Sequence, residues 1–461
     1  MSIAKSTLRQ VGDDGSNLGY GRMTHLFFPS FSKMARVSRL SVYMTAYLCL
    51  CLLANMALVL MFITGYQLRS GTPAAHIPRP SQLAEDWDPH SGRLLNCADL
   101  PSITNLSIIG SGWTKAVYRG EYGKTWLAVK TVHTSGHDMT ECHETVSICY
   151  KQCAAKIIKE SLLLRELSHN NVIKVFGECV PGVDYSPGPP VAGVVAMITE
   201  LGHPVNVIEV LQMNFEERLQ LASDIGRILY HLAQSPLGTL LMKDFRREQF
   251  VISGGSLKLS DVDDVVIGDH PCTTDQDCAI KDGVKENILI NLTCVMEVCK
   301  GFNSHLNAIH ASQHFMRLLI PYGGPAALES ACLHIVNLQS RGLLDSEAVH
   351  HEIQSLVRNY SSGAYLSAAE KDTIQNFIVY HGYTIDEADF SCLRTVRTGC
   401  VQSVSSPEEG AWLCSQFPEC MAFVLINQWT WTGRQIAIFK GGVREMRKKK
   451  QHTLYIRRGQ G

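Results

Sequence analysis

The sequence predicts an α+β protein with a β-rich N-terminal lobe and a helical C-terminal lobe, preceded by one apolar N-terminal helix. Three features predict it: a long uncharged apolar run near the N-terminus, β-branched and aromatic runs broken by glycine from Asn105 to Val132, and helical periodicity from Glu160 onward. With 461 residues, 45% of them hydrophobic, the chain is long enough for about two or three folded domains.

The N-terminal apolar run predicts a signal anchor or signal peptide over residues 40–68. No charged residue occurs between Arg39 and Arg69, and a helix that spans a bilayer needs only about 20 apolar residues. The basic segment 1–39 that precedes the run should stay in the cytosol, so the rest of the chain enters the secretory lumen. Both a type II membrane anchor and secretion after cleavage remain open.

A proline-containing stretch, residues 69–98, reads as a lumenal stalk before the globular part. Two of the 16 cysteines lie in the apolar run, and the others would face an oxidising lumen, which favours disulfides. No Cys-x-x-Cys pair occurs, so structural zinc is disfavoured. Three Asn-x-Ser/Thr triplets become candidate glycan sites: Asn105, Asn291 and Asn359.

Charge argues against one class of partner. Lys and Arg together number 42 and Asp and Glu 43, so the formal net charge is −1. Such a balance provides no overall field for binding nucleic acid, and we expect no nucleic-acid partner.

A glycine-containing turn and two charged side chains form the first set of chemical motifs. The run GSGWTKAV, residues 110–117, lies between two predicted strands, where glycines let backbone N–H groups approach phosphates. The strand that follows ends in Lys130, whose ammonium suits α- and β-phosphates and needs a carboxylate to orient it. Glu160 is the candidate partner because its helix would turn it toward the sheet.

A second set of motifs follows in the helical half. The run MITELG, residues 197–202, predicts a strand that leaves into a connector able to bind an adenine through its backbone. Asp244 is followed five residues later by Gln249, and Asp261 comes after another apolar strand. These groups supply a hydroxyl acceptor and two metal ligands, as phosphoryl transfer requires.

The order of these motifs resembles the protein-kinase fold. The runs MITELG, SPLG, KDFRREQF and LKLSDVDD are similar to those of secreted tyrosine kinases of the vertebrate lonesome kinase type. The same family is also called "protein kinase domain-containing, cytoplasmic". The resemblance implies a bilobal protein-kinase-like domain over residues 99–385 that uses ATP with Mg²⁺ or Mn²⁺. It also implies phosphorylation of tyrosine in secreted and extracellular-matrix proteins, in the Golgi and secretory lumen and outside the cell.

The resemblance assigns a role to each motif residue. Asp244 would be the catalytic base, and Gln249 and Asp261 would hold the metal. The residues that would bind ATP are Gly110, Gly112, Val117, Lys130, Glu160, Thr199 and Glu200. Arg246, two residues after the base, is typical of tyrosine-specific catalytic loops, and the family resemblance also implies tyrosine as the substrate residue.

The chain also departs from the kinase pattern. The departures are Lys115 for the third loop glycine, Met242-Lys243 for His-Arg, Gln249 for asparagine and Val262-Asp263 for Phe-Gly. They leave a second interpretation open, in which the protein is a catalytically inactive pseudokinase that acts as a secreted or membrane-anchored interaction protein. No tyrosine occurs between Asp264 and Pro321, and four cysteines occupy that region instead. We expect disulfides to hold this segment where phosphorylation holds it in cytosolic kinases.

A second unit is predicted at the C-terminus, residues 386–461. Four cysteines between Cys392 and Cys420 are followed by strand-like runs, which suggests a small disulfide-stapled module, loosely similar to apple/PAN modules, or an extension packed on the helical lobe. The tail beyond it is basic, so either a solvated tail or a site for a heparin-like polyanion is expected there.

Overall fold

The computed structural model describes residues 88–181, 194–281, 288–386, 390, 392 and 399–459. They all lie in one compact unit, Arg79–Gly461. The predicted segments 1–39 and 40–68 and most of the stalk lie outside the described residues. Within the described ranges, no helix is both long and apolar enough to cross a membrane.

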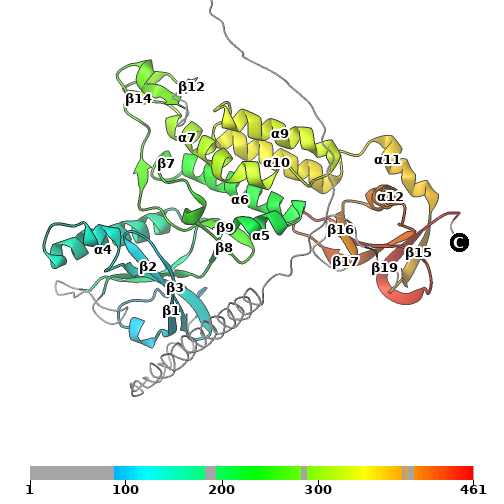
Figure 1. Cartoon of the computed structure of the whole chain (residues 1–461), viewed down its shortest axis with the longest axis horizontal. Helices are drawn as coiled ribbons and strands as arrows, with labels where there is room; N and C mark the ends of the chain where they lie inside the picture. The colour runs from blue at the N-terminus through cyan, green and yellow to red at the C-terminus, as the bar shows by residue number, and fades with distance from the viewer. Residues whose placement is uncertain are drawn as a thin grey trace, which may run out of the picture. The chain divides into compact units, whose positions relative to one another are not determined.

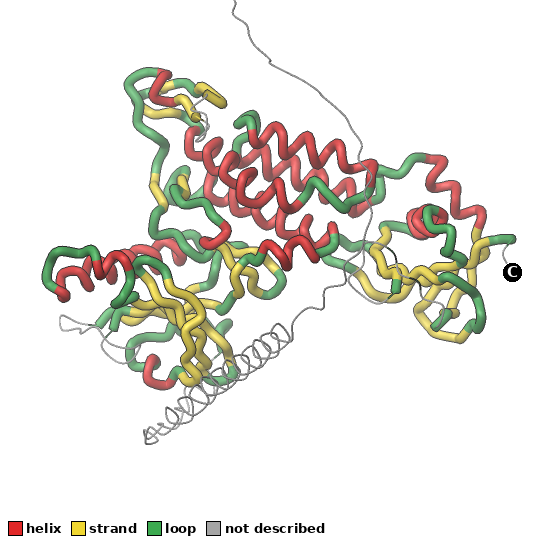
Figure 2. Tube along the Cα trace, in the orientation of Figure 1, coloured by secondary structure: helices red, strands yellow, loops and turns green. Residues whose placement is uncertain are grey.

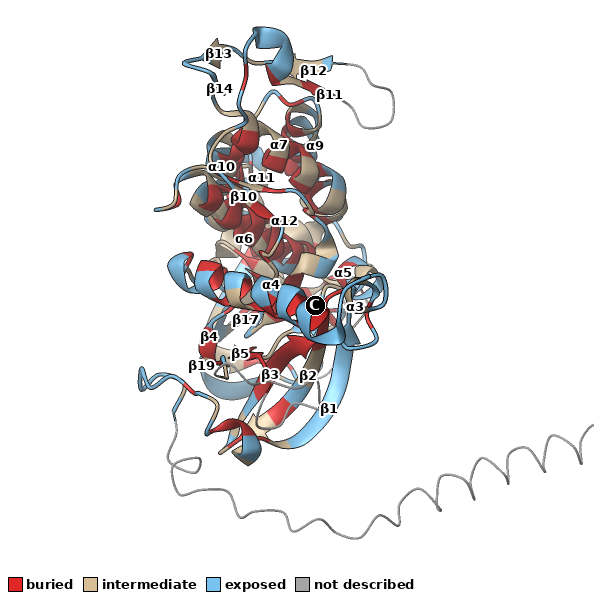
Figure 3. Ribbon diagram, turned by 90° about the vertical axis from the view of Figure 1, so that its left-hand side faces the viewer, coloured by how far each residue is buried: buried red, intermediate tan, exposed pale blue. Residues whose placement is uncertain are grey.

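The N-terminal lobe, residues 88–200, is built on a five-stranded antiparallel sheet with the order β1-β2-β3-β5-β4. The sheet was predicted for residues 105–132, and β4 and β5 extend it. Helix α4, capped by the Thr145 hydroxyl, packs against β3 and β5 and has one buried and one exposed side (Figure 3). The elements are η1 Leu100–Ser102, β1 Thr104–Ser111, β2 Lys115–Tyr122, β3 Thr125–Val132, α3 His137–Thr140, α4 Val146–Glu166, β4 Val175–Cys179 and β5 Ala196–Glu200.

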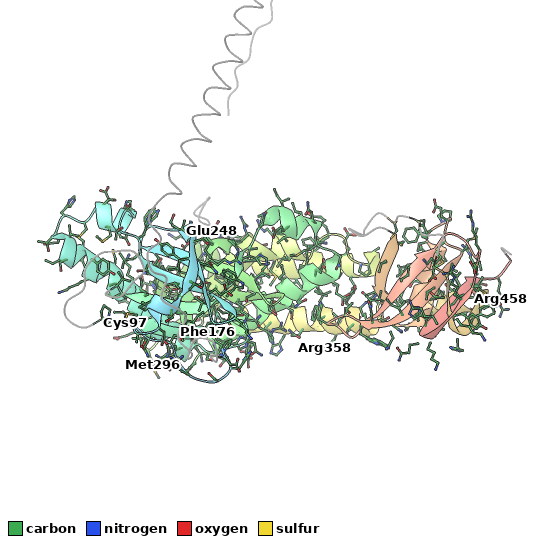
Figure 4. The ribbon with its side chains drawn as sticks, turned by 90° about the horizontal axis from the view of Figure 1, so that it is seen from below. Cys97, Phe176, Glu248, Met296, Arg358 and Arg458 are labelled. Carbon is green, nitrogen blue, oxygen red and sulfur yellow. A yellow bond between two sulfur atoms is a disulfide. The ribbon has the colours of Figure 1, made fainter. Side chains whose placement is uncertain are left out.

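The segment before η1 is tied to strand β4. The Leu95 amide donates to the Phe176 carbonyl at 2.8 Å, and the Cys97–Cys179 disulfide links the same two segments (Figure 4). A Cβ on Gly177 would lie 2.1 Å from the Leu95 carbonyl oxygen, so only glycine allows this approach. The N-terminal lobe therefore includes residues that the sequence analysis assigned to the stalk.

The C-terminal lobe, residues 201–376, is mainly helical. Helix α6 is largely buried and lies beside α10 and α7 (Figures 1 and 3). A capping box starts this helix, in which the Asn214 and Glu217 side chains each accept a hydrogen bond from the other residue's backbone amide. Phe315 and Leu319 are buried in the core of this lobe, and Leu318 is half-buried. The helices are α5 Val207–Gln212, α6 Phe215–Ala233, α7 Phe302–Ala311, the π-helix η4 Ser312–Met316, α8 Arg317–Leu319, α9 Ala326–Ser340, α10 Ser346–Ser362, α11 Ala368–Asp372 and the short η5 Thr373–Asn376.

Short strands connect the two lobes and frame the loops between them. Strand β8 pairs with β6 and β9, and β7 pairs with β10. The 3-10 helix η2 Arg247–Gln249 lies between β7 and β8. The strands are β6 His203–Pro204, β7 Leu240–Met242, β8 Phe250–Ser253, β9 Ser256–Leu259 and β10 Val265–Ile267.

The segment after β10 is held by two disulfides, Cys272–Cys294 and Cys278–Cys299. This confirms that the four cysteines are paired with one another and not free. The segment contains η3 Asp275–Cys278, β11 Ala279–Lys281, β12 Ile288–Asn291, β13 Cys294–Val295 and β14 Val298–Cys299. The turn between β13 and β14 carries Met296, whose exposed fraction is 93% (Figure 4).

The C-terminal module, residues 377–459, is a second five-stranded sheet with the order β15-β19-β17-β18-β16 (Figure 2). Its first strand precedes residue 386, where the sequence analysis begins this unit. The disulfides Cys392–Cys400 and Cys414–Cys420 staple it. Its elements are β15 Phe377–Thr384, β16 Cys400–Val404, α12 Pro407–Ser415, β17 Ala422–Trp429, β18 Gln435–Lys440 and β19 Arg447–Arg457. The basic residues predicted as a tail thus belong largely to β19.

The module packs on the C-terminal lobe through buried polar contacts. The Arg434 guanidinium pairs with Glu409 at 2.5 Å, donates to the Tyr360 carbonyl at 2.6 Å and lies over the Tyr360 ring. The Glu216 carboxylate of α6 accepts hydrogen bonds from Ser403 and Thr432 of the module. This agrees with the expectation of an extension packed on the helical lobe.

Candidate active site

The ion pair predicted between Lys130 and Glu160 is present in the N-terminal lobe. Lys130 lies near the end of β3 and Glu160 lies on α4, which crosses that strand. Their side chains meet at 2.7 Å, and both residues are buried. The Lys130 ammonium also donates to the Ser260 carbonyl at 2.6 Å, so the pair reaches across to the C-terminal lobe. Glu160 and Ser260 together therefore fix the position of the Lys130 ammonium.

The glycine-containing turn between β1 and β2 is open on the side where a ligand would lie. A Cβ built on Gly110 meets nothing within 4 Å, and one on Gly112 would meet only the Lys115 carbonyl, at 3.9 Å. The Gly112 amide donates to that carbonyl at 2.8 Å and closes the turn. Val117, two residues along β2 from Lys115, is the cross-strand partner of both Gly110 and Lys130. Gly110, Val117 and Lys130, three of the residues predicted to bind ATP, therefore lie side by side on neighbouring strands.

Asp244 lies in the loop between β7 and η2. The Arg246 guanidinium donates to its carboxylate at 2.6 Å, and the amide nitrogen of Gln249 donates to the same oxygen. Phe245 turns the other way and packs in the core against Phe250 and Phe315. The loop is thus anchored by an apolar side chain and presents its carboxylate on the opposite side.

Asp261 follows β9, and backbone hydrogen bonds join its segment to Gln249, at the end of the loop that carries Asp244. The backbone amides of Ser260 and Asp261 donate to the Gln249 carbonyl at 2.8 and 3.2 Å. A small open pocket is lined by Met242, Lys243, Asp244, Gln249, Asp261, Val262, Asp263, Asp264 and Val265. The predicted base and both predicted metal ligands therefore line one pocket.

Lys115 is the functional residue whose place sequence reasoning missed. Its ammonium contacts both carboxylate oxygens of Asp261 at 2.7 Å, Asp263 at 3.1 Å, and Glu160. The signal that could have found it is strand alternation, because Lys115 and Val117 are two residues apart on β2, and Val117 is paired with Lys130.

Electrostatics in this cluster follow from burial and opposite charge. Burial by itself would raise the pKa of Asp261, but the ammonium groups of Lys115 and Lys130 outweigh it and lower that pKa to about 2. Burial raises the pKa of Asp263 to about 6, and the nearby Asp261 charge adds to the increase. Burial lowers the pKa of Lys115, yet Glu160, Asp261 and Asp263 together raise it overall. Asp261 is therefore ionised at neutral pH, as a metal ligand must be.

The donor set suits a divalent cation. Oxygens of Glu160, Asp261 and Asp263 lie within 4.8 Å of one another. Hard cations such as Mg²⁺ take carboxylate and amide oxygens, and Gln249 lines the same pocket as Asp261. The residues present fit a metal–nucleotide complex between the glycine turn and the Asp244 loop.

The remaining predicted site residues have other neighbours. Thr199 is buried in β5, and the Glu200 carboxylate pairs with Lys258 at 2.8 Å and accepts from Ser253 at 2.6 Å. The Glu200 side chain thus joins β5 to the C-terminal lobe, so a contact to adenine would come from the backbone. The candidate glycan residues Asn105, Asn291 and Asn359 are all exposed.

Comparison with known proteins identifies the family. No protein-family model matches the chain. The chain is 33% identical over 375 residues to the "Extracellular tyrosine-protein kinase PKDCC" of Homo sapiens, and the alignment covers 80% of this chain and 74% of that protein. The β-rich N-terminal lobe and the helical C-terminal lobe of the structure are consistent with a kinase-like fold. The chain belongs to the family of the extracellular tyrosine-protein kinase PKDCC.

Proposed function

We propose that this chain is a protein kinase of the secretory pathway and extracellular space that transfers the γ-phosphate of ATP to tyrosine in secreted and extracellular-matrix proteins. The relative in Homo sapiens is named as an extracellular tyrosine-protein kinase. The observation that carries the proposal for this chain is the convergence of Asp244, Gln249 and Asp261 on one pocket, next to the Lys130–Glu160 pair. The Golgi lumen and the extracellular space are the compartments in which the six disulfides would form.

Each residue would perform one task in phosphoryl transfer. Lys130, oriented by Glu160, would bind the α- and β-phosphates, and the glycine turn would cover them. Asp261 and Gln249 would hold Mg²⁺ or Mn²⁺, which neutralises charge on the phosphates. The Asp244 carboxylate would orient the tyrosine hydroxyl and accept its proton as the oxygen attacks the γ-phosphorus and ADP leaves.

The proposal also names tyrosine as the substrate residue that accepts the γ-phosphate. Arg246 pairs with the Asp244 carboxylate at the pocket rim, and its side chain is exposed. An arginine held there could pair with an acidic or phenolic substrate group without moving the base. The substrate residue is decided by phosphoamino-acid analysis of the products.

The test uses protein produced in the secretory pathway, with ATP, Mn²⁺ and a mixture of secreted proteins. Asp244→Asn and Lys130→Met should each lower phosphotyrosine formation by at least about 100-fold, because the first removes the proton acceptor and the second removes the ammonium that would bind the α- and β-phosphates. Asp372→Asn and Lys124→Met are matched controls, since both residues are exposed, and they should keep full activity. Equal phosphotyrosine from all five proteins would instead support the alternative of a pseudokinase that acts as an interaction protein.

Lys115 is the observation that favours that alternative. In a pseudokinase the ammonium would stay among Glu160, Asp261 and Asp263 and exclude a metal. Binding of Mn²⁺ with a non-hydrolysable ATP analogue, measured by calorimetry, separates the two functions, because only the kinase must bind both.

We further propose that the disulfide-held segment after β10 replaces a phosphorylated activation segment. The Cys272 amide donates to the Glu297 carbonyl at 2.9 Å, and the Cys299 amide donates to the His270 carbonyl at 2.8 Å, so the two disulfides are reinforced by backbone bonds. A peptide map in which these four cysteines are free thiols would remove this proposal.

The proposal also includes a membrane attachment, a polyanion site and three glycans. The N-terminal apolar helix, which lies outside the described residues, would attach the protein to a membrane unless it is cleaved. Residues 447–450 of β19 are all basic and exposed, and Arg447 is paired with Asp386 at 3.1 Å. A heparin-like polyanion would bind there, so replacing residues 448–450 by glutamine should abolish retention on heparin at physiological salt. Glycans at Asn105, Asn291 and Asn359 would appear as a mass loss after glycosidase treatment.

A further inference from the structure

Lys115 and Lys130 project from the same side of the N-terminal sheet. In the β2–β3 ladder Val117 faces Lys130 and Lys115 faces Val132. Cross-strand partners point to one face of a sheet, and residues two apart on a strand share that face. Both ammonium groups therefore enter the same cleft, and each meets a different oxygen of Glu160.

The contacts of Lys115 are those expected of a bound cation. Its side chain is 10% exposed, and its ammonium lies against three carboxylates, two of which come from the other lobe. It contacts both oxygens of Asp261, as a cation bound by a bidentate carboxylate does. These are also the three carboxylates whose oxygens converge within 4.8 Å.

A divalent ion and this ammonium cannot share the position. Two like charges a few ångströms apart in a partly buried site repel strongly, and both need the same Asp261 oxygens. The lysine side chain has four methylene groups and can swing while β2 stays in place. A triphosphate under the glycine turn would offer the displaced ammonium a new negative partner.

We propose that Lys115 is an internal counter-cation that occupies the Asp261 carboxylate in the nucleotide-free protein and that the divalent ion displaces it from that carboxylate. This rests on the proposed function in that the ion is the one that accompanies ATP. Lys115 would lower the affinity of the free protein for metal, so the ion enters effectively only when nucleotide arrives with it. The third loop glycine of the kinase pattern is thereby replaced by a residue with a task of its own.

Binding of Mn²⁺ without nucleotide tests this by isothermal titration calorimetry, on wild type, Lys115→Met and Lys124→Met. Lys124 is the matched control because it is an exposed lysine in the turn between β2 and β3, on the same hairpin as Lys115. Lys115→Met should bind Mn²⁺ about tenfold or more tightly than wild type, since a competing charge is gone. Lys124→Met should match wild type. Equal or weaker binding by Lys115→Met would overturn the proposal.

A second measurement on wild-type protein decides the matter if Lys115→Met does not fold. Amine acylation followed by peptide mass spectrometry reports the accessibility of each lysine. Acylation of Lys115 should be slow in the free protein and rise several-fold on saturation with Mn²⁺, while that of Lys124 stays constant. Protection of Lys115 that is unchanged by Mn²⁺ would contradict displacement. Neither readout needs phosphoryl transfer, so a protein that makes no phosphotyrosine can still pass this test, and an active one can fail it.

Discussion

Arg434 offers the sharpest test of how the C-terminal module is attached. Replacing it by methionine keeps an unbranched apolar side chain over the Tyr360 ring but removes the charge and all five N–H donors. The Glu409 carboxylate, which is also buried, would then lose its cationic partner. Two carbonyls that accept from the guanidinium, those of Tyr360 and Ser403, would lose a donor as well.

The magnitude follows from burial. Arg434 and Glu409 are each 1% exposed, so solvent screens their interaction little. Removing one partner of a buried ion pair costs about 3–5 kcal/mol, because the other charge stays buried and unpaired. At roughly 2 °C per kcal/mol for a folded unit of this size, Arg434→Met should lower Tm by about 6–10 °C.

Differential scanning calorimetry measures the effect, with Arg358→Met as the control. Arg358 lies on α10 and is exposed (Figure 4), so its loss should change Tm by no more than about 1 °C. Adding Glu409→Gln to Arg434→Met should recover part of the loss, since it removes the uncompensated charge. A Tm for Arg434→Met within about 2 °C of wild type would refute the idea that this buried pair holds the module.

Three further predictions concern the N-terminal lobe. Gly177→Ala should lower the free energy of unfolding by about 1–3 kcal/mol in urea titrations, because its Cβ would lie 2.1 Å from the Leu95 carbonyl; an unchanged value would mean that the segment before η1 is not docked on β4. Replacing both Cys97 and Cys179 by serine should lower the free energy of unfolding by up to about 4 kcal/mol in the same titrations, since the disulfide closes a loop with a sequence separation of 82 residues. For His169, burial and a stacked histidine lower the pKa from 6.5 to about 4. The unfolded chain therefore binds more protons between these values, so the stability that His169 contributes is full above pH 6.5 and is lost as pH falls toward 4. A His169→Gln variant should show a shallower loss of unfolding free energy over that window, and identical slopes would contradict the assignment.

Local patterns were sufficient for much of the active site. The strands that hold the glycine turn and the Lys130–Glu160 pair were predicted because each depends on residues a few positions apart or on one helix facing one strand. Asp244, Gln249 and Asp261 were predicted as a group because their order and spacing along the chain carry the chemistry.

Contacts between distant segments were not predictable in the same way. The ammonium of Lys115 reaches a carboxylate 146 residues later in the chain, and nothing in its own neighbourhood requires that contact. Glu216 accepts from Ser403 across 187 residues, which the sequence gives no reason to expect. The Glu200 side chain pairs with Lys258, 58 residues later in the chain, a contact that the sequence does not indicate.

The amino-acid sequence by itself predicted the strands around the glycine turn, the residues that we propose for phosphoryl transfer, and disulfides among the cysteines that follow the apolar run. Twelve of those cysteines are paired, whereas Cys153 and Cys332 are free and buried. The predicted properties follow from periodicity, side-chain chemistry and compartment, and each of these can be inferred from short stretches of the sequence. Only the tertiary structure decided which cysteines pair, where the C-terminal module docks, and that Lys115 lies among the carboxylates of Glu160, Asp261 and Asp263. Such choices depend on strand register and on lobes meeting across long loops, because a side chain can pair only with what the whole fold brings within a few ångströms.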